Sequence, residues 1–600
     1  MILQHLLMPR AGICNQQNMY VRVDEKNARF VNEHQALSFC KGGTARFDTY
    51  FNGFSIEKWQ KYTQVQNVFV TLQLKGKFEI QLCSKEKIHD TISEKELSIT
   101  TFESSETTSI TLPFHSYDNK GMFYVRLNAL EDGAEYHGGF YSAEIAPEKL
   151  QNVEIAIDIC TFRREKFIIR NLDILSQYVL DNKDNELSKH LQVFISDNGK
   201  TLDIPTLSND KIHIVENKNV GGAGGFTRGL MEILHCSTYR ATHALIMDDD
   251  ILIDPEALYR TYAFLRCRKP EYDDLFVGGA MLRLDQPNIQ VESGAVWNAG
   301  NLESKKAGLD LNKVKNCLYN ELEEYCEYNA WWYCCVPMSV VNENNLPMPI
   351  FIRGDDLEYG LRNIKHMALL NGICVWHEPF ENKYSSFLSY YILRNMLYDN
   401  ALHFKHYSKK RLISRMCNMV FHELMYYRYK NVDLIFRGVN DFLKGVEFLE
   451  NTDGEKLHQE IMAAGYRGQD LSQLDMPFSY PTYAASLTEV DGGIKKKLRC
   501  IGFNGLLRST NRDNIVSMAL CRPINFYRAK RVMQYDVTSQ KAFITEKDTK
   551  KTLHYLWLLF KEACKINREF DEAFRKFGEE AGRLQTEEFW KKYLDLNKEG

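Results

Sequence analysis

The stretch HALIMDDDILIDPEAL, residues 243–258, places three consecutive carboxylates directly after four apolar residues. The apolar part predicts a buried strand that ends at the acidic triplet. Comparable apolar runs begin at residues 153, 191, 212 and 275, and helical patterns such as residues 164–180 separate them. Strands that alternate with helices predict a mostly parallel sheet, whose ligand lies beyond the carboxyl ends of the strands.

The patterns on either side of this region predict two further domains. Residues 1–150 contain short β-branched and aromatic runs between turn residues, which are typical of an antiparallel β-sandwich. Residues 385–600 are rich in long helix formers and aromatic residues, and they predict a mainly helical domain that is interrupted near residues 478–500. The expected organisation is therefore a sandwich, an α/β domain at residues 151–384 and a helical domain.

Composition limits the classes of function. Hydrophobic residues make up 44% of the chain and charged residues 26%, which is typical of a globular protein. The formal net charge of -4 argues against nucleic-acid binding through bulk charge. The 15 cysteines contain no CxxC motif and fit a reducing cytosol. We expect neither a secretory signal nor a membrane-spanning helix.

The acidic triplet predicts a metal site. Side chains on an extended segment alternate, so Asp248 and Asp250 are expected to point to one side and Asp249 to the other. Two carboxylates on one side suit a hard divalent cation, Mn²⁺ or Mg²⁺, which would remove their repulsion. The alternative is a solvated acidic turn before the helix that begins near Pro255, with Asp254 as its N-cap.

A glycine-rich segment follows the third predicted strand of this domain. Residues 217–230, NKNVGGAGGFTRGL, precede a helix that we expect from Gly225 onward. Gly224, Gly225 and their neighbours would allow close backbone approach, and free N–H groups at a helix start favour anions. The segment matches neither a Walker loop nor GxGxxG, so an ordinary tight turn is an equal alternative.

A second acidic pair, Asp355 and Asp356, stands at the start of a predicted helix, and the next strand ends at His377. The dipole at a helix N-terminus keeps a carboxylate ionised, so that it can accept a proton from a substrate hydroxyl. We assign Asp356 as this base and Asp355 as the helix cap. His377 offers an imidazole nitrogen that Mn²⁺ accepts, although a structural role is the alternative.

Seven motifs occur in a recognisable order: CTFRRE, SDNG, NVGGAGGFTRGL, MDDD, NAWWYCCVP, FIRGDDLEYGLR and VWHEPF. Together they resemble a GT-A glycosyltransferase of the inverting family 2, and most closely the bacterial galactofuranosyltransferases that use UDP-galactofuranose. FDTYFNGFSIEKW and VTLQLKGKFEIQLCS extend the resemblance to that family's N-terminal β-sandwich. The resemblance implies a GT-A catalytic domain at residues 151–384, between an N-terminal all-β sandwich and a C-terminal helical region.

The resemblance also implies roles for individual residues. Asp248, Asp250 and His377 would hold the cation on the diphosphate, and Asp356 would be the general base. The residues expected at the nucleotide sugar are Thr161, Arg163, Asp197, Asp249, Gly224 and Gly225. The residues expected at the acceptor are Trp331, Trp332, Glu292 and Asp355. One departure is Gly354, because the family usually has Trp immediately before the acidic pair.

Other assignments keep an alternative. Core packing competes with acceptor binding for Trp331 and Trp332, and Trp297 fits either role. Arg394 would make a structural ion pair or contact phosphate. The basic and apolar residues of 492–514 and 521–533 suit a peripheral contact with anionic lipid, a solvated face or a subunit contact.

The resemblance implies a homo-oligomer that acts on a glycan or lipid-linked acceptor. The cysteines and the two basic segments add the expectation of a cytoplasmic protein that is peripheral on the inner face of the plasma membrane. Three other functions compete with this one. The first is the same fold with another donor, as in a rhamnosyl- or glucosyltransferase. The second is a non-catalytic glycan-binding assembly subunit, and the third is a metal-dependent phosphohydrolase. The intact acidic residues argue against a degenerate subunit.

Overall fold

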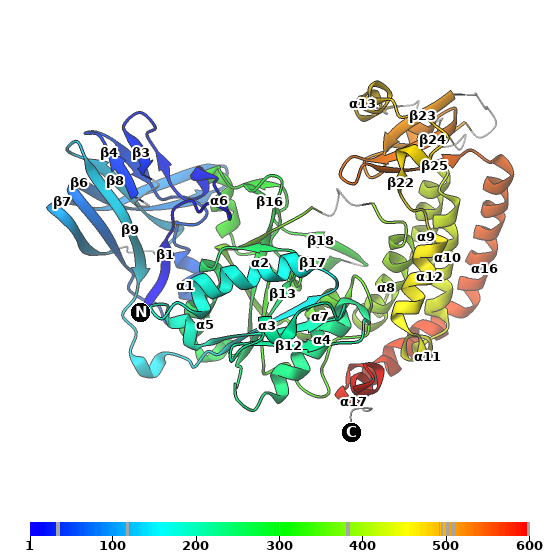
Figure 1. The fold of residues 1–600 in the computed structure, drawn as a ribbon, viewed down its shortest axis with the longest axis horizontal. Helices are drawn as coiled ribbons and strands as arrows, with labels where there is room; N and C mark the ends of the chain where they lie inside the picture. The colour runs from blue at the N-terminus through cyan, green and yellow to red at the C-terminus, as the bar shows by residue number, and fades with distance from the viewer. Residues whose placement is uncertain are drawn as a thin grey trace.

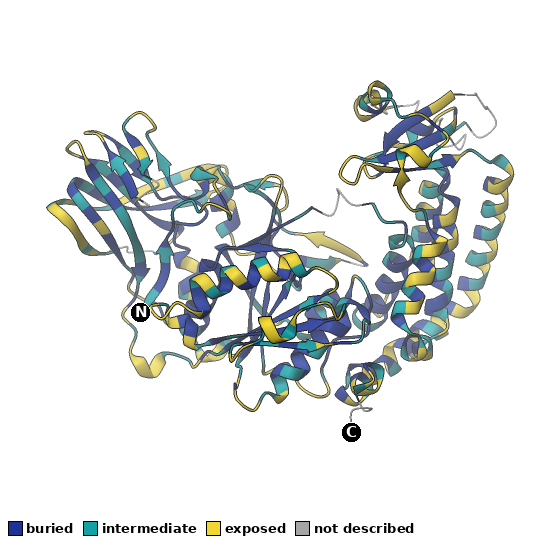
Figure 2. Ribbon diagram, in the orientation of Figure 1, coloured by how far each residue is buried: buried dark blue, intermediate teal, exposed yellow. Residues whose placement is uncertain are grey.

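The computed structural model describes residues 1–31, 36–115, 119–298, 300–379, 384–490, 492–493, 496–497, 499, 504–505 and 512–596. Three regions follow one another along the chain: an N-terminal β region, a central α/β region, and a C-terminal region of long helices with a small sheet (Figure 1). Buried residues concentrate on the central strands and on the inner faces of the C-terminal helices (Figure 2).

The N-terminal region is a single antiparallel sheet of nine strands. Its longest strands are β6 (Phe69–Ile88) and β7 (Thr91–Pro113), which pair along their length. The other edge of β6 pairs first with β9 (Ala134–Ser142) and then with β8 (Met122–Ala129). The sheet thus has two arms that share β6, and the packing of these arms as a sandwich stays a prediction. The remaining strands are β1 (Ile2–Leu6), β2 (Arg22–Val23), β3 (Ala28–Val31), β4 (Ala36–Phe39) and β5 (Thr44–Arg46).

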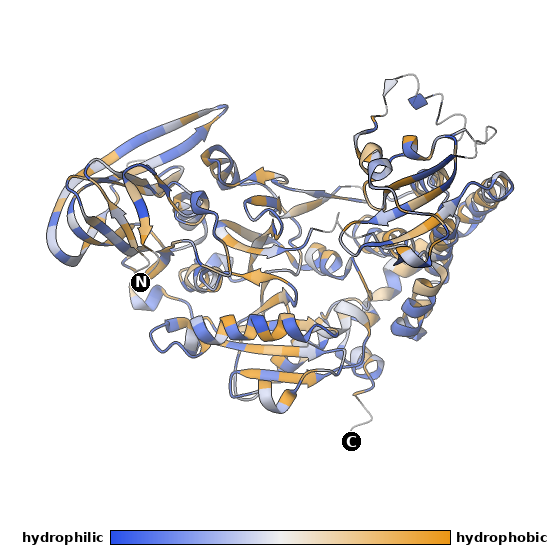
Figure 3. Ribbon diagram, turned by 45° about the horizontal axis from the view of Figure 1, so that its top comes forward, coloured by the Kyte–Doolittle hydropathy of each residue, from blue (hydrophilic) through white to orange (hydrophobic). Residues whose placement is uncertain are grey.

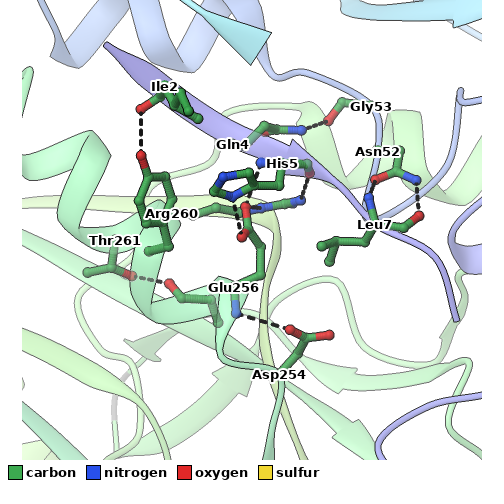
Figure 4. A network of polar contacts seen from close by, with 12 residues as sticks. Ile2, Gln4, His5, Leu7, Asn52, Gly53, Asp254, Glu256, Arg260 and Thr261 are labelled. Carbon is green, nitrogen blue, oxygen red and sulfur yellow. Dashed lines mark hydrogen bonds and ion pairs between the residues drawn. The ribbon is translucent and has the colours of Figure 1, made fainter. Parts of the chain in front are cut away.

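The N-terminal strand β1 is tied to the helix α5 (Glu256–Arg266) of the central region (Figure 4). Glu256 accepts hydrogen bonds from the backbone nitrogen of His5 at 2.7 Å and pairs with its Nδ1 at 2.8 Å. Arg260 bonds both to Glu256 and to the carbonyl of His5. Asp254 accepts from the Glu256 backbone nitrogen at 3.0 Å, but the N-cap of α5 is Pro255 and not, as was expected, Asp254. These buried polar contacts fix the β region on the central region.

The central region contains a ten-stranded mixed sheet. Four of its strands are parallel neighbours: β12 (Ile212–Glu216), β11 (Leu191–Asp197), β10 (Ile155–Thr161) and β13 (His243–Asp248). Their register places Thr161 beside Asp197, and Cys160 beside Asp248. The carboxyl ends of three strands therefore meet at one edge, as the alternating pattern predicts. Hydrophobic residues follow these strands (Figure 3) because both faces of the sheet are covered.

The rest of this sheet brings a distant segment to the same edge. The strand β15 (Leu275–Arg283) pairs in parallel with β21 (His366–His377), and β20 (Cys334–Pro337) runs antiparallel between β13 and β15. The short β14 (Leu252–Ile253) pairs with Trp376 and Val375 near the end of β21. The remaining strands are β16 (Ile289–Glu292) and β19 (Leu309–Asp310), and a separate hairpin joins β17 (Ala295–Asn298) to β18 (Asn301–Ser304). The helices are α2 (Glu165–Leu175), α4 (Gly221–His235), α6 (Val314–Glu321) and α7 (Asp355–Asn363).

The C-terminal region contains a four-stranded sheet in addition to the expected helices. Its strands are β22 (Gln469–Asp470), β23 (Arg512–Ser517), β24 (Ala529–Asp536) and β25 (Lys541–Glu546). The stretch 521–533, interpreted as a basic and apolar lipid-facing segment, forms the short helix α15 (Pro523–Phe526) and much of β24. Val532 and Met533 are fully buried there, so its apolar side chains largely serve the fold. Most of the other basic stretch, 492–514, lies outside the described residues.

The C-terminal helices are long and pack against one another. They are α8 (Leu388–His403), α9 (Lys409–Met425), α10 (Tyr429–Leu443), α11 (Val446–Asn451), α12 (Gly454–Ala464), α13 (Tyr480–Thr488), α16 (Thr549–Glu580) and α17 (Glu587–Tyr593). The last of these returns to the central region, where Trp590 is fully buried and donates from Nε1 to the carbonyl of Pro347 at 2.9 Å. Within the described residues, no helix combines the length and the apolar character that crossing a membrane would require.

Candidate active site

Three predicted metal ligands converge at the carboxyl edge of the central sheet. Asp248 ends β13, Asp250 follows two residues later, and His377 ends β21. Asp250 Oδ1 lies 3.0 Å from His377 Nε2, and one ligand atom from each of the three residues lies within 4.8 Å of the others. Two carboxylate oxygens and one imidazole nitrogen fit a divalent ion such as Mn²⁺. The convergence of strands distant in sequence creates this cluster.

The cluster is electrostatically unfavourable without a cation. Burial, and then the negative charge of Asp250, raise the pKa of Asp248 to about 7. A carboxyl group that resists ionisation in this way is stabilised as the carboxylate when a divalent ion binds beside it. The geometry and the charge of the site both favour a metal.

Asp249 is not part of the three-residue cluster, and it lies with Asp250 in the turn that follows β13. Its Oδ2 accepts a hydrogen bond from Thr161 Oγ1 at 2.8 Å, and its Oδ1 accepts one from Arg164 at 2.8 Å. The same guanidinium lies 2.7 Å from Asp250 Oδ2. Arg164 therefore links the two aspartates and orients the metal-facing one.

The sequence analysis selected Arg163 and missed Arg164. Arg163 is exposed, has a φ of 55°, and places its guanidinium 5.1 Å from the Phe162 ring. The signal was the arginine pair in CTFRRE, directly after a strand, but sequence alone did not show which arginine faces the acids. A nucleotide contact by Arg163, and by Thr161 beyond its bond to Asp249, stays a prediction.

Asp197 organises the turn after β11. Its Oδ1 accepts from the backbone nitrogen of Gly199 at 2.9 Å, and its Oδ2 accepts from Thr201 at 2.7 Å and Leu202 at 2.8 Å. The side chain is fully buried. This network shapes the loop beside Thr161, while a direct contact with a nucleotide stays a prediction.

The glycine-rich segment enters its helix earlier than expected. The helix α4 begins at Gly221, not at Gly225, because Gly221 turns the chain with a φ of 83°. Gly224 and Gly225 lie inside the helix and face the core. A methyl group on Gly225 would lie 2.0 Å from Cys160 Sγ, and one on Gly224 would lie 2.0 Å from Val220 Cγ2. These two glycines therefore serve close helix packing, and their expected contact with the nucleotide sugar stays a prediction.

Within the glycine-rich segment 217–230, Gly222 lies beside the second acidic pair. Its would-be Cβ lies 3.5 Å from Asp355 Oδ2. The start of α4 thus faces the start of α7, and two helix N-termini with their positive dipole ends meet beside the carboxyl groups. An anion-binding role for this junction stays a prediction.

The candidate base Asp356 lies in the first turn of α7. Its Oδ2 accepts a hydrogen bond from the Tyr328 hydroxyl at 2.6 Å, and its Oδ1 accepts from the Leu357 backbone nitrogen at 2.8 Å. Burial raises the pKa of Asp356 above its ordinary value, and the bond from Tyr328 partly offsets that rise. Tyr328 was missed by the sequence analysis, because no local pattern connects it to Asp356.

Asp355 is not the helix cap that we expected. The N-cap is Gly354, with a φ of 109° and no side-chain cap, and Asp355 is the first helical residue. It is buried, and burial together with the charge of Asp356 raises its pKa well above the ordinary value. Neighbouring carboxyls that cannot both ionise easily are common where acid–base chemistry occurs.

Comparison with known proteins supports an enzyme built on this site. Residues 3–143 match the family model described as Galactofuranosyltransferase 2 N-terminal. The chain is 25% identical over 477 residues to Galactofuranosyltransferase GlfT2 from Mycolicibacterium smegmatis, covering 75% of this chain and 72% of that protein. It is 26% identical over 483 residues to Galactofuranosyltransferase GlfT2 from Mycobacterium tuberculosis, covering 75% of this chain and 73% of that protein.

The chain is a glycosyltransferase. Among solved structures, a mannosyltransferase from Pyrobaculum calidifontis in complex with GDP-Man and Mn²⁺ is 13% identical, covers 46% of this chain and 67% of that chain, and has a TM-score of 0.25. Glucosyl-3-phosphoglycerate synthase from Mycobacterium tuberculosis is 11% identical, covers 41% of this chain and 80% of that chain, and also has a TM-score of 0.25. At these TM-scores, the likeness adds nothing to the sequence match.

The tryptophans expected at the acceptor of this glycosyltransferase are buried. Trp331 is 4% exposed and packs edge-on against Phe226 and Tyr359, and Trp332 is 5% exposed. Trp332 donates from Nε1 to the carbonyl of Gly279 at 2.9 Å. Such burial favours the core-packing alternative, and a contact of either tryptophan with the acceptor stays a prediction.

Glu292 is better placed for a substrate role. It is 7% exposed and accepts a hydrogen bond from Ser304. Burial raises the pKa of Glu292 to about 7, with a smaller contribution from the charge of Asp356. A contact of Glu292 with the acceptor stays a prediction.

Arg394 is structural. It is 1% exposed, its guanidinium lies over the rings of Tyr390, Tyr391 and Tyr398, and it donates to Tyr390 and Asn395. Stacking on aromatic rings replaces both alternatives that the sequence suggested, an ion pair and a phosphate contact.

Proposed function

We propose that this glycosyltransferase transfers galactofuranose from UDP-galactofuranose to a hydroxyl group of a cell-surface glycan or lipid-linked acceptor, with inversion and with a divalent cation. The observation that carries the proposal is the convergence of Asp248, Asp250 and His377 at the sheet edge where donors bind in such folds. The printed names of the two relatives supply the choice of sugar.

Asp248, Asp250 and His377 would hold the cation. Their carboxylate oxygens and imidazole nitrogen suit Mn²⁺ or Mg²⁺. Bound there, the ion would supply charge neutralisation to the leaving diphosphate. Arg164 holds Asp250 at 2.7 Å and Asp249 at 2.8 Å, so it fixes the ligand set before donor binding. This is the contribution of the protein to donor orientation.

Asp356 would take the proton of the acceptor hydroxyl as that oxygen attacks the anomeric carbon. The Tyr328 hydroxyl occupies Oδ2 at 2.6 Å and orients the carboxylate. A single displacement from the face opposite the leaving group inverts the anomeric carbon and forms no covalent enzyme intermediate. The charge of Asp356 contributes to the raised pKa of Glu292, and Glu292 would hydrogen-bond sugar hydroxyls.

The test is product analysis with UDP-galactofuranose and a short synthetic galactofuranoside, beside a panel of other nucleotide sugars. We expect Mn²⁺-dependent release of UDP with a new galactofuranosyl linkage, and we expect Asp356→Asn to lose turnover while it keeps UDP affinity. Faster transfer from a rhamnosyl or glucosyl donor would contradict the proposal that UDP-galactofuranose is the donor. Nucleotide-sugar hydrolysis that no acceptor accelerates would favour a hydrolase instead.

We also propose a cytoplasmic homo-oligomer with peripheral membrane contact. Arg522 and Lys530, which flank the buried part of residues 521–533, are exposed and suit anionic lipid headgroups. Sedimentation with vesicles tests the contact: binding that depends on acidic lipid supports it, and equal binding to neutral vesicles contradicts it. Analytical ultracentrifugation tests the subunit number, and a monomer at all concentrations contradicts the oligomer.

A further inference from the structure

One face of α8 carries three polar residues, each one helical turn from the next, toward the start of α7. Asn395 donates from Nδ2 to the carbonyls of Ile352 and Arg353, both at 2.7 Å. His403 lies 3.1 Å from Glu358 through Nε2. Asp399 stands between these two anchors, so the packing of α8 on α7 fixes its position.

Asp399, unlike its two neighbours on this face, has no polar partner. It is 2% exposed, its Oδ1 is enclosed by protein, and none of the described residues hydrogen-bonds or ion-pairs with it. An enclosed carboxyl without a partner costs stability, and native proteins satisfy nearly all such groups. A polar ligand that binds during the reaction would satisfy this one.

The backbone beside Asp399 leaves its carboxyl uncovered on the side of the acidic pair. A side chain at position 354 would begin 3.3 Å from Asp399 Oδ2 and 3.8 Å from Oδ1. Glycine at this position, with a φ of 109°, adds no such side chain. Because Gly354 directly precedes Asp355 and Asp356, the Asp399 carboxyl borders the segment that carries the candidate base.

The chemistry of Asp399 restricts the ligand. Burial, and then the charges of Glu358, Asp356 and Asp355, raise the pKa of Asp399 well above its ordinary value. Burial therefore disfavours the ionised carboxylate, and a carboxyl group that keeps its proton both donates and accepts hydrogen bonds. A neutral hydroxyl has the same two capacities.

We propose that Asp399 is an acceptor-binding residue whose carboxyl hydrogen-bonds a hydroxyl of the acceptor sugar, next to the hydroxyl that Asp356 deprotonates. The proposal rests on the glycosyl transfer proposed above and adds a specificity-determining contact to it. Its ligand is the acceptor alone, so donor binding and the cation do not depend on it.

The experiment compares two substitutions in the full-length enzyme. Asp399→Leu keeps the shape and removes the polar atoms, and Asp399→Asn keeps a neutral group that donates and accepts. Steady-state kinetics with Mn²⁺ and UDP-galactofuranose give the KM of a galactofuranoside acceptor and, separately, the KM of the donor. We expect Asp399→Leu to raise the acceptor KM about three- to tenfold, the range for one lost hydrogen bond, and Asp399→Asn to restore most of it.

Asp158 supplies a matched control. It is a fully buried carboxyl of β10 with neither oxygen hydrogen-bonded, and it faces Gly229 of α4 and not α7. Asp158→Leu and Asp399→Leu should both change the melting temperature, because each removes a buried polar group. Only Asp399→Leu should change the acceptor KM, which separates a ligand contact from a structural effect.

Two outcomes would overturn the inference. If Asp399→Leu leaves the acceptor KM unchanged, Asp399 is a core residue that does not contact the acceptor. If Asp399→Leu and Asp399→Asn raise the acceptor KM equally, Asp399 is an ionised group that binds a cationic ligand. A failure of the proposed function is distinguishable, because the unsubstituted enzyme would then transfer no sugar from UDP-galactofuranose to the acceptor at all.

Discussion

Replacing Tyr328 with phenylalanine removes the hydrogen bond that its hydroxyl donates to the candidate base at 2.6 Å. The bond favours the ionised form of Asp356 and lowers its pKa, against the burial that raises it. A hydrogen bond to a charged group contributes about 1.5–3 kcal/mol, and about 1.4 kcal/mol corresponds to one pH unit. The Asp356 carboxyl in Tyr328→Phe should therefore hold its proton to a pH about one to two units higher.

The sign of the effect follows from the role of the base. A general base acts only when it is deprotonated, so turnover falls as the pH drops through its pKa. In Tyr328→Phe, this acid limb of the kcat profile should move to higher pH, and turnover should recover in more alkaline buffer. The assay is UDP release between about pH 5 and pH 9, at saturating Mn²⁺, donor and acceptor.

Tyr325→Phe is the matched control, because it removes a hydroxyl that donates to Glu327 at 3.2 Å from an exposed side chain. Its profile should match that of the unsubstituted enzyme. A Tyr328→Phe enzyme whose rate drops equally at every pH, with the limb in place, would refute the reasoning. Tyr328 would then support the fold of the site and not the ionisation of Asp356.

Three further substitutions test the donor side of the site and its supports. Asp250→Ala should abolish the rise in melting temperature that Mn²⁺ causes in the unsubstituted enzyme; an undiminished rise would move the metal elsewhere. Gly225→Ala should destabilise the protein by about 1–3 kcal/mol in denaturant unfolding, because its methyl group would lie 2.0 Å from Cys160 Sγ; an unchanged midpoint would contradict this packing. Trp590→Ala should cost about 3–5 kcal/mol in the same assay, since its ring is fully buried against the central region; a loss below about 1 kcal/mol would show that α17 docks weakly.

The sequence predicted the residues that stand at the ends of strands. Asp248 and His377 end β13 and β21, and Asp250 follows β13 closely enough to join them. These positions follow from local rules, since a strand delivers its last side chain to the carboxyl edge of the sheet. The alternating α/β pattern of the central region was predictable for the same reason.

What escaped prediction depends on tertiary packing. Tyr328 meets Asp356 across 28 positions of sequence, and nothing in its neighbourhood indicates that contact. A pair of tryptophans such as Trp331 and Trp332 occurs in protein cores as well as in sugar-binding grooves. The sequence cannot distinguish these two places, and only the burial in the structure favours the core. The sheet of the C-terminal region was missed because the basic and apolar alternation of β24 also fits a lipid-facing segment.

The charges of the site imply an order of binding. Asp249 and Asp250 have the guanidinium of Arg164 beside them, but Asp356 and Asp399 lie buried among other carboxyls. The carboxyl groups of the site would repel an anionic diphosphate until a cation is bound. Neutral acceptor hydroxyls would instead meet carboxyl groups that can hydrogen-bond them. UDP affinity should therefore depend steeply on Mn²⁺, and acceptor affinity should not. Calorimetric titration of UDP with and without Mn²⁺ measures this, and equal UDP affinities would contradict a cation-first order.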